Sequence, residues 1–298
     1  MQKDFRRNLI YGIIVIFALA VSYLGSEPLR EAKNRDKILS NELEVTFIDV
    51  EQGDSCLITD SLGKTLLIDG GESEAYESHL EPFLDSRGIE AVDTAVVSHY
   101  HSDHMDGIFE LVRDGRVKNL ILPDYEDSDD SRAMLELQAK KSETAVSFVS
   151  AGDVIDSGIT ALDAKVLHPK KGGSGGKNFH NNSSLVLRLE YGKTVFMLVG
   201  DIEARAEKEI MIRSNVECDV LKIAHHGSTS SSSKDFITAA DPTYGIISAG
   251  KGNRYGHPHH EVLGLLQDED IRIYRTDVDG NITFRVSENK IEDIRFSK

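Results

Sequence analysis

The sequence has few cysteines, few basic residues for its length, and a single long hydrophobic run. Its two cysteines, Cys56 and Cys218, lie far apart and form neither a CxxC motif nor the count needed for a disulfide framework. We expect two buried thiols, with one disulfide as the alternative. Because neither cysteine lies near the N-terminal hydrophobic run, a lipoprotein anchor is excluded.

Basic residues are outnumbered, with 34 Lys and Arg against 50 Asp and Glu and a formal net charge of -16. Without residues 1–26 the balance is 31 against 49, a net charge of -18. Such a surface repels polyanions at long range, which argues against broad, sequence-independent binding to duplex nucleic acid. A local basic groove is compatible with these numbers.

The one long hydrophobic run covers residues 8–25 and follows the basic residues Lys3, Arg6 and Arg7. It predicts a membrane anchor, with residues 1–25 as anchor or signal segment, 26–41 as a polar spacer and 42–298 as the domain. The small residues at 18–20 also fit a signal-peptidase site, and a buried helix is the third alternative. An anchor or a signal would place the domain outside the cytoplasm. Because no second long run follows, a multi-helix channel is excluded.

From residue 42 onward, short apolar runs alternate with helical patterns, which favours an α/β or α+β class with helices covering sheets. Several polar clusters come just after a predicted strand, where ligand sites are common in sheet proteins. The glycine-rich segment 170–178 lacks the residues of a phosphate loop and predicts a flexible linker. We expect strands at 43–50, 64–71, 93–100, 117–123, 218–228, 243–250 and 291–297, a hairpin at 183–201, helices at 74–86, 105–112, 131–142, 204–214 and 259–267, and closing strands at 271–286 around a turn at 278–281.

The segment "HYHSDH" at residues 99–104 has the density of donors expected of a metal site. His99 and His101 are two residues apart, so in an extended chain both rings project to the same side. Asp103 and His104 follow at a turn and point elsewhere, which suits a second ion near the first. The alternative, a polar loop that caps the next helix, explains a lone histidine better than this pattern.

Later clusters supply further donors. His180 precedes one predicted strand, and Asp201 follows another, where a carboxylate can bridge two cations; a helix N-cap is the alternative role for Asp201. His225 and His226 are adjacent, so we expect them to face opposite ways and only one, preferably His226, to bind metal. A last loop, "YGHPHH", contributes His257, His259 and His260.

These blocks resemble the metallo-β-lactamase superfamily, and more closely the soluble hydrolase domain of the ComEC competence (DNA-uptake) family. The resemblance rests on "FIDVEQGDSCLI", "LLIDGG", "SHYHSDHMDG", "SSLVLRLEYGKTVFMLVGDIE", "DVLKIAHHGS" and "YGHPHHEVLGLL". The "HHGS" block also occurs in choline-phosphate esterases of the same superfamily. One departure is Glu51, at a position where the family motif usually has glycine.

The resemblance implies an α+β fold, the αββα sandwich of the metallo-β-lactamase fold, with two divalent ions at one edge of the sheets. Zinc is expected, with manganese or iron as alternatives. Asp69 would orient the histidine loop. The implied first-ion ligands are His99, His101 and His180, the second-ion ligands Asp103, His104 and His226, and the bridging ligand Asp201.

The expected activity is phosphodiester hydrolysis by a membrane-anchored, extracytoplasmic enzyme, with DNA or an envelope polymer as substrate. His225 or His257 would donate a proton or bind the phosphate, with Asp103 also at the reacting centre, and Ser228 and His259 would contact substrate. The alternatives are a phosphorylcholine or teichoic-acid type phosphoesterase, an inactive metal-binding module of a competence or envelope machine, and an acyl or lactam hydrolase. The oligomeric state is left open.

Overall fold

A computed structural model describes residues 42–125, 130–172 and 178–298, and Glu42–Lys298 is one compact unit. The predicted anchor at 8–25, the spacer at 26–41 and most of the glycine-rich linker lie outside the described residues and stay predictions. Within the part that the structure describes, no helix is both long and apolar enough to span a bilayer. Cys56 and Cys218 are buried and free, as expected.

The described chain forms an eight-stranded sheet in the order β14-β13-β1-β2-β3-β4-β5-β6. Neighbours from β3 to β6 are parallel, and the remaining neighbours are antiparallel. The strands are β1 (Glu42–Phe47), β2 (Cys56–Asp60), β3 (Thr65–Ile68), β4 (Val92–Val96), β5 (Val117–Pro123), β6 (Ala145–Val149), β13 (Ile282–Ser287) and β14 (Ile291–Phe296).

A six-stranded sheet has the order β12-β11-β10-β9-β8-β7 among the described residues. Neighbours from β9 to β12 are parallel, whereas β7, β8 and β9 are antiparallel, so the predicted hairpin around Gly192 is present. The strands are β7 (Leu162–His168), β8 (Val186–Tyr191), β9 (Thr194–Leu198), β10 (Val220–Lys222), β11 (Tyr244–Ile247) and β12 (Arg272–Arg275).

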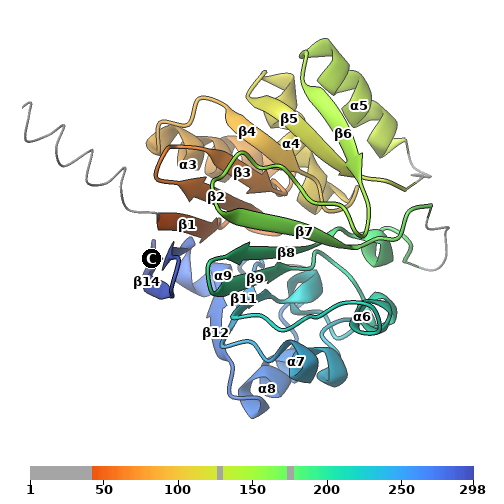
Figure 1. Cartoon of the computed structure of the whole chain (residues 1–298), viewed down its shortest axis with the longest axis vertical. Coiled ribbons are helices and arrows are strands. Elements are labelled where there is room, and N and C mark those ends of the chain that lie inside the picture. Colours follow the sequence, from red (N-terminus) through yellow and green to blue (C-terminus); the bar gives the residue numbers. More distant parts are fainter. Residues whose placement is uncertain (1–41, 126–129, 173–177) are drawn as a thin grey trace, which may run out of the picture. The chain divides into compact units, whose positions relative to one another are not determined.

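The two sheets pack face to face, with helices on both outer faces (Figure 1). Strand alternation explains this layering: in β3, Leu66 and Ile68 join the core between the sheets, while Leu67 joins the core under the helices. This is the αββα arrangement that the resemblance implied. The helical elements are α2 (Ser73–Ala75), η1 (Tyr76–Leu80), α3 (Glu81–Ser86), α4 (Ser102–Arg113) and α5 (Ser131–Lys141) in the first half, and η2 (Asn181–Ser183), α6 (Ala204–Met211), η3 (Ala224–Gly227), α7 (Lys234–Ala240), α8 (His260–Asp268) and α9 (Thr276–Asp279) in the second.

Three sequence-based expectations need correction. The single helix expected at 74–86 is three consecutive pieces, α2, η1 and α3. The closing strands at 271–286 are not a hairpin, because β12 and β13 belong to different sheets and α9 carries the chain between them. Strands β2, β6 and β7 and helices α7 and α9 were not predicted; β6 has an exposed, irregular burial pattern that leaves no clear period in the sequence.

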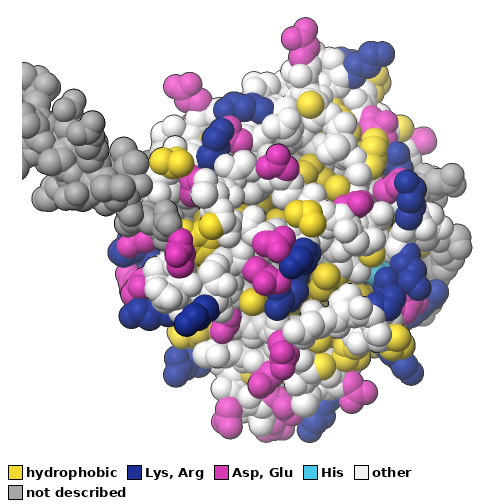
Figure 2. Space-filling view, viewed as in Figure 1, with side chains coloured by type: hydrophobic (Ala, Val, Ile, Leu, Met, Phe, Trp, Pro, Cys, Tyr) yellow, Lys and Arg dark blue, Asp and Glu magenta, His cyan; other side chains and the backbone are white. Residues whose placement is uncertain are grey.

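The surface carries both acidic and basic side chains, as the composition of the sequence leads one to expect. On the face that Figure 2 shows, acidic and basic side chains are interspersed and no continuous basic area is visible. The parallel strands of both sheets end at one edge of the molecule, since β4 leads into His99 and β9 into Asp201. That edge carries the site.

Candidate metal centre

Helix α4 presents the "HYHSDH" segment. His101 is its N-cap and has extended backbone angles, φ -77° and ψ 149°, but the chain bends at residues 98–101 after β4 ends at Val96, so the extended segment expected across His99 and His101 is not continuous. Asp103 and His104 fall in the first helical turn. The backbone of that turn is held by neighbouring loops: Asp54 N donates to the carbonyl of Asp103 at 3.1 Å, and Gly70 N donates to that of His104 at 2.8 Å. The four predicted ligands therefore sit on a fixed turn.

The first donor group is His99, His101 and Asp201, whose ligand atoms lie within 4.8 Å of one another. The rings of His99 and His101 have centroids 4.7 Å apart. Burial, followed by repulsion from His104, holds the pKa of His99 well below 6.5, and burial also lowers the pKa of His101. Both imidazoles are thus uncharged at neutral pH, the form that binds metal.

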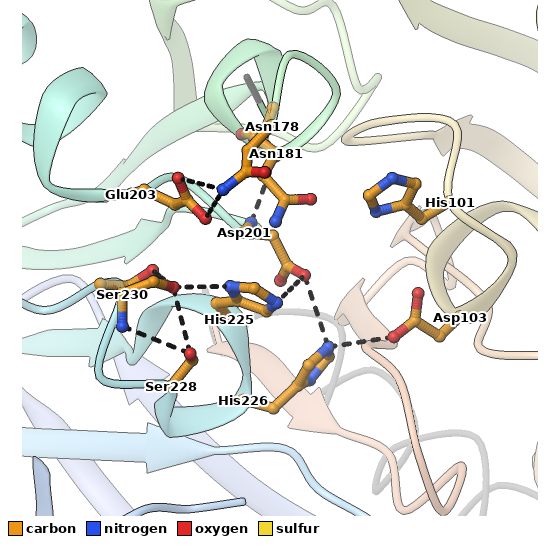
Figure 3. A network of polar contacts seen from close by, with 12 residues as sticks. His101, Asp103, Asn178, Asn181, Asp201, Glu203, His225, His226, Ser228 and Ser230 are labelled. Carbon is orange, nitrogen blue, oxygen red and sulfur yellow. Dashed lines mark hydrogen bonds and ion pairs between the residues drawn. The ribbon is translucent and has the colours of Figure 1, made fainter. Parts of the chain in front are cut away.

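The second donor group is Asp103, His104 and His226. Nε2 of His226 lies 3.2 Å from Oδ2 of Asp103, and Nε2 of His104 lies 3.3 Å from Oδ1 of Asp201. Asp201 therefore stands between the two groups. Figure 3 shows His101 and Asp103, from the start of α4, and Asp201 and His226, from later loops, converging on one space.

The donor atoms fit a cation. Among the described residues, Nε2 of His104, Nε2 of His226 and Oδ1 of Asp201 are buried and have no hydrogen-bond partner. Ligands at roughly 2.0–2.2 Å from a tetrahedral ion are roughly 3.3–3.6 Å apart, which is close to the separations of 3.2 and 3.3 Å given above. Burial opposes charge on His226, but Asp201, Asp103 and Asp54 raise its pKa to about 10. The carboxylates thus favour positive charge here, which a metal ion would supply.

Asp69 lies where the resemblance placed an orienting carboxylate. It follows β3 in the left-handed backbone region, at φ 58°. Its oxygens accept hydrogen bonds from the Ser98 backbone N–H and hydroxyl, both at 2.7 Å, and lie 2.9 Å from Nδ1 of His104. This contact turns Nε2 of His104 towards Asp201.

A second buried carboxylate, Asp54, was missed by the sequence reasoning, although it lies in the quoted "EQGDS" block. Oδ1 of Asp54 is 3.2 Å from Nδ1 of His226 and 2.9 Å from Nζ of Lys222. Burial raises the pKa of Asp54, but Lys222, followed by His226, outweighs this and lowers it to about 2. Lys222 comes from β10, where Val220 on the same face belongs to the core between the sheets. No sequence signal marks such a lysine as buried.

The expectation that His225 and His226 face opposite ways is wrong. The strand ends at Lys222, and both histidines have left-handed backbone angles, with φ of 51° and 54°. Both Nε2 atoms lie 3.6 Å from Oδ2 of Asp201. His226 is buried and belongs to the second donor group, whereas the His225 side chain is 24% exposed. The preference for His226 as the ligand stays a prediction that this geometry favours.

His180 lies beside the first donor group but not within it. Its ring centroid is 5.4 Å from that of His101, and Nδ1 lies 3.5 Å from the hydroxyl oxygen of Tyr125. Its loop is held by Glu203, whose carboxylate accepts hydrogen bonds from Asn178 at 2.7 and 2.9 Å (Figure 3). The same carboxylate accepts a hydrogen bond from Asn182 at 3.1 Å. These contacts of Glu203 were not predicted from the sequence. A ligand role for His180 stays a prediction.

The residues predicted to contact substrate or donate a proton, apart from His225 and Asp103, lie on one side of the centre; they are His257, Ser228 and His259. His257 lies next to both neighbouring histidines, with ring centroids 5.7 Å from His225 and 6.2 Å from His226. The hydroxyl of Ser228 forms a hydrogen bond of 3.1 Å with that of Ser230, within the turn that follows His226. Nδ1 of His259 accepts a hydrogen bond from the Thr229 N–H of the same turn at 3.1 Å. Ser228 and His259 thus hold this turn and loop together, and a substrate contact by either stays a prediction.

Glu51 has a backbone conformation that is unusual for a residue other than glycine. Its φ is 58°, in the left-handed region that glycine adopts without cost. The side chain is exposed. The position therefore requires a glycine-like backbone, and this chain adds a carboxylate there.

The chain belongs to the metallo-beta-lactamase superfamily, because the family model matches residues 48–251. The fold of the crystal structure of the metallo-beta-lactamase fold protein YhfI from Bacillus subtilis agrees, with a TM-score of 0.52, 15% identity and coverage of 78% of this chain and 95% of that one.

Within the superfamily, the resemblance to the ComEC competence family is confirmed. The chain is 38% identical over 264 residues to ComE operon protein 3 of Bacillus subtilis, covering 83% of this chain and 33% of that protein. It thus spans about a third of the length of this curated relative. A shorter segment of 66 residues is 40% identical to endoribonuclease ysh-1 of Neurospora crassa, covering 20% of this chain and 8% of that protein.

Proposed function

We propose that residues 42–298 are a dinuclear, metal-dependent phosphodiesterase that cleaves nucleic acid, held outside the cytoplasm by the hydrophobic run at 8–25. The observation that carries this proposal is the position of Asp201. Its carboxylate belongs to the donor group of His99 and His101, and it lies within 3.6 Å of both His104 and His226 of the second group. A carboxylate between two such groups suits a bridging ligand.

The residues present fit two divalent ions, with zinc favoured by the mixed nitrogen and oxygen donors and manganese or iron as alternatives. Such ions, when bound, lower the pKa of water to near neutrality and neutralise charge on a phosphoryl group. His99 and His101 would hold one ion, with His180 in reach, and Asp103, His104 and His226 the other.

The neighbouring histidines would handle substrate. His225 lies against Asp201 and is partly exposed, so it is placed to give a proton to the leaving oxygen. Burial, followed by repulsion from His226 and His225, lowers the pKa of His257 to about 4. His257 is therefore uncharged at neutral pH and would donate a hydrogen bond to a phosphoryl oxygen rather than release a proton.

The proposed substrate is nucleic acid because the chain resembles a DNA-uptake family, with ComE operon protein 3 as a relative, and because it shares a shorter match with an endoribonuclease. One observation favours the second candidate, a phosphorylcholine-type phosphoesterase: Glu72 is within electrostatic range of both Asp103 and Glu51, and acidic groups beside the centre suit a cationic headgroup. Single-stranded DNA and a choline-phosphate ester, offered to the same zinc-loaded protein, separate the two candidates.

The proposed reaction is tested with bis(p-nitrophenyl) phosphate and the full-length chain. Hydrolysis should stop with a chelator and return with zinc or manganese. His101→Ala should lose the activity, whereas His260→Ala is the matched control because its side chain is 92% exposed. Absence of hydrolysis of this ester and of both natural substrate classes, with every metal loaded, would overturn the proposal and leave the inactive metal-binding module.

A further inference from the structure

A column of stacked side chains leads from the candidate metal centre to the surface. The ring of His226 stacks with that of His257 at an interplanar angle of 26°, and His257 stacks with Tyr255 at 19° and 5.6 Å. The guanidinium carbon of Arg254 lies 4.8 Å from the Tyr255 ring centroid. Tyr255 is thus two ring contacts from a predicted metal ligand.

The loop that carries Tyr255 is built around Asn253. Oδ1 of Asn253 accepts hydrogen bonds from the backbone N–H groups of Tyr255 and His257 at 3.1 and 3.0 Å. Its Nδ2 donates to the carbonyls of Gly250 and His257 at 2.9 and 2.6 Å. One side chain therefore fixes the backbone on both sides of Tyr255, and the ring is held in place without being buried.

Tyr255 has no packing role that explains its position. It is 46% exposed and belongs to none of the three hydrophobic clusters of the described residues. Its hydroxyl contacts Nη2 of Arg254 at 2.6 Å. An aromatic ring held rigidly at the mouth of a site, with part of its surface open, is suited to stacking a ligand.

Arg254 brings positive charge close to Glu72 and Asp103. Its guanidinium is exposed, and within the described chain no carboxylate lies at ion-pair distance. The contact with Tyr255, followed by the more distant Glu72 and Asp103, raises its pKa. Arg254 is therefore within electrostatic range of Glu72 and of Asp103, a member of the second donor group.

We infer that Tyr255 and Arg254 form a subsite for the nucleotide next to the cleaved bond, with the base stacked on the exposed ring or guanidinium plane and Arg254 paired to the flanking phosphate. This inference rests on the proposed function and adds the residues that select single-stranded nucleic acid. A quaternary ammonium group is disfavoured on the same ring because it would share it with the Arg254 cation.

The chain has no tryptophan, so Tyr255→Trp in the full-length, zinc-loaded protein creates a single fluorescent reporter at this position. A short single-stranded DNA should quench its fluorescence in a saturable way, and an abasic strand of the same length should not. Equal quenching by both strands, or none by DNA, overturns the inference. Quenching by a choline-phosphate ester but not by DNA also overturns it and favours the cationic headgroup.

Kinetics give a second readout that a merely structural role would not produce. The measured quantity is the ratio of kcat/KM for DNA to kcat/KM for abasic DNA. Tyr255→Ala should lower this ratio by about tenfold, because one base stack is lost. Phe296→Ala is the matched control, with an aromatic ring 43% exposed on β14, and should keep the wild-type ratio. An unchanged ratio in Tyr255→Ala contradicts the inference. If neither strand is cleaved, the proposed function fails by itself, and the fluorescence result still decides whether the subsite exists.

Discussion

Nζ of Lys222 lies 2.9 Å from Oδ1 of Asp54, and both side chains are buried, with 3% and 9% exposed. A lysine between two sheets is tolerated because this carboxylate neutralises it and the carbonyl of Ile223 accepts another of its protons at 3.0 Å. The same oxygen of Asp54 faces Nδ1 of His226. The ion pair therefore links the core to a predicted metal ligand.

Removing one partner of this pair leaves a buried, uncompensated charge. Lys222→Met should lower the free energy of unfolding by about 3–5 kcal/mol, measured by urea denaturation with chelator present. The double variant Lys222→Met/Asp54→Asn should lose less than Lys222→Met alone, because both charges are gone. If the two substitutions are additive, the pair does not couple as its geometry indicates.

Asp54→Asn should also weaken metal binding. The carboxylate supports His226 together with the Ser248 carbonyl, which lies 3.0 Å from the same Nδ1 atom. Loss of a group that orients a metal ligand usually lowers metal affinity by about 10- to 100-fold. Because the Ser248 carbonyl remains, we expect the affinity for the second ion to fall by about tenfold. Zinc competition against a chromogenic chelator measures it, with exposed Asp235→Asn as the control. Equal affinities in the two variants would remove Asp54 from the centre.

Substitution of Asp201 and substitution of His101 should differ in the number of metal ions that the protein loses. Asp201 stands between both donor groups, whereas His101 belongs to one. Asp201→Ala should therefore lose both ions and His101→Ala one, as counted by elemental mass spectrometry after gel filtration in zinc-containing buffer. Two retained ions in Asp201→Ala would exclude a bridging role.

The sequence predicts the centre best where local spacing decides side-chain direction. "HYHSDH" predicted the convergence of the His99 and His101 rings and the turn at Asp103 and His104, because these are short-range consequences of the residue spacing. His225 and His226 could not be predicted in this way, since their left-handed angles are imposed by the turn that follows β10. Asp54 and Lys222 meet only through the packing of two sheets, which no local pattern encodes.

The same limit applies to the fold. The alternation of strands and helices predicts only an α/β or α+β class with helices covering sheets, whereas the two packed sheets were implied by the family resemblance. The hairpin around Gly192 has a local turn signal. The turn near Asp279 and Gly280 looks the same in the sequence as a hairpin turn, yet it carries the chain from one sheet to the other. Which of the two occurs depends on the pairing of β13 with β1, more than 200 residues earlier.

Two helical glycines should respond in opposite ways to alanine. A Cβ at Gly107 would lie 2.0 Å from the carbonyl oxygen of Gly70, because α4 packs directly on that loop. Gly107→Ala should destabilise by about 1–3 kcal/mol and disturb the metal-binding turn. A Cβ at Gly264 in α8 meets nothing within 4 Å, so Gly264→Ala should stabilise by about 0.5–1 kcal/mol. Thermal unfolding of both variants checks the contrast, and a neutral Gly107→Ala contradicts the close approach.

Asp106 in α4 should make stability depend on pH. Burial, followed by repulsion from Glu110 and Glu72, raises its pKa from 3.8 to about 6. Between these values the folded state holds the proton more tightly than the unfolded state, so stability falls as the pH rises through this window. Above pH 6 the ionised carboxylate is a net cost.

Asp106→Asn removes that cost. Because the side chain is only half-buried and solvent screens it, we expect a gain of about 1 kcal/mol in the free energy of unfolding at pH 7.5 and little change at pH 4. Urea denaturation at both pH values with chelator present measures it, and Glu77→Gln, exposed on η1, controls for the change in net charge. Bound cations near Asp103 would offset the same repulsion, so the gain should shrink when zinc is added. A gain of equal size at pH 4 and pH 7.5 would show that ionisation of Asp106 is not its cause.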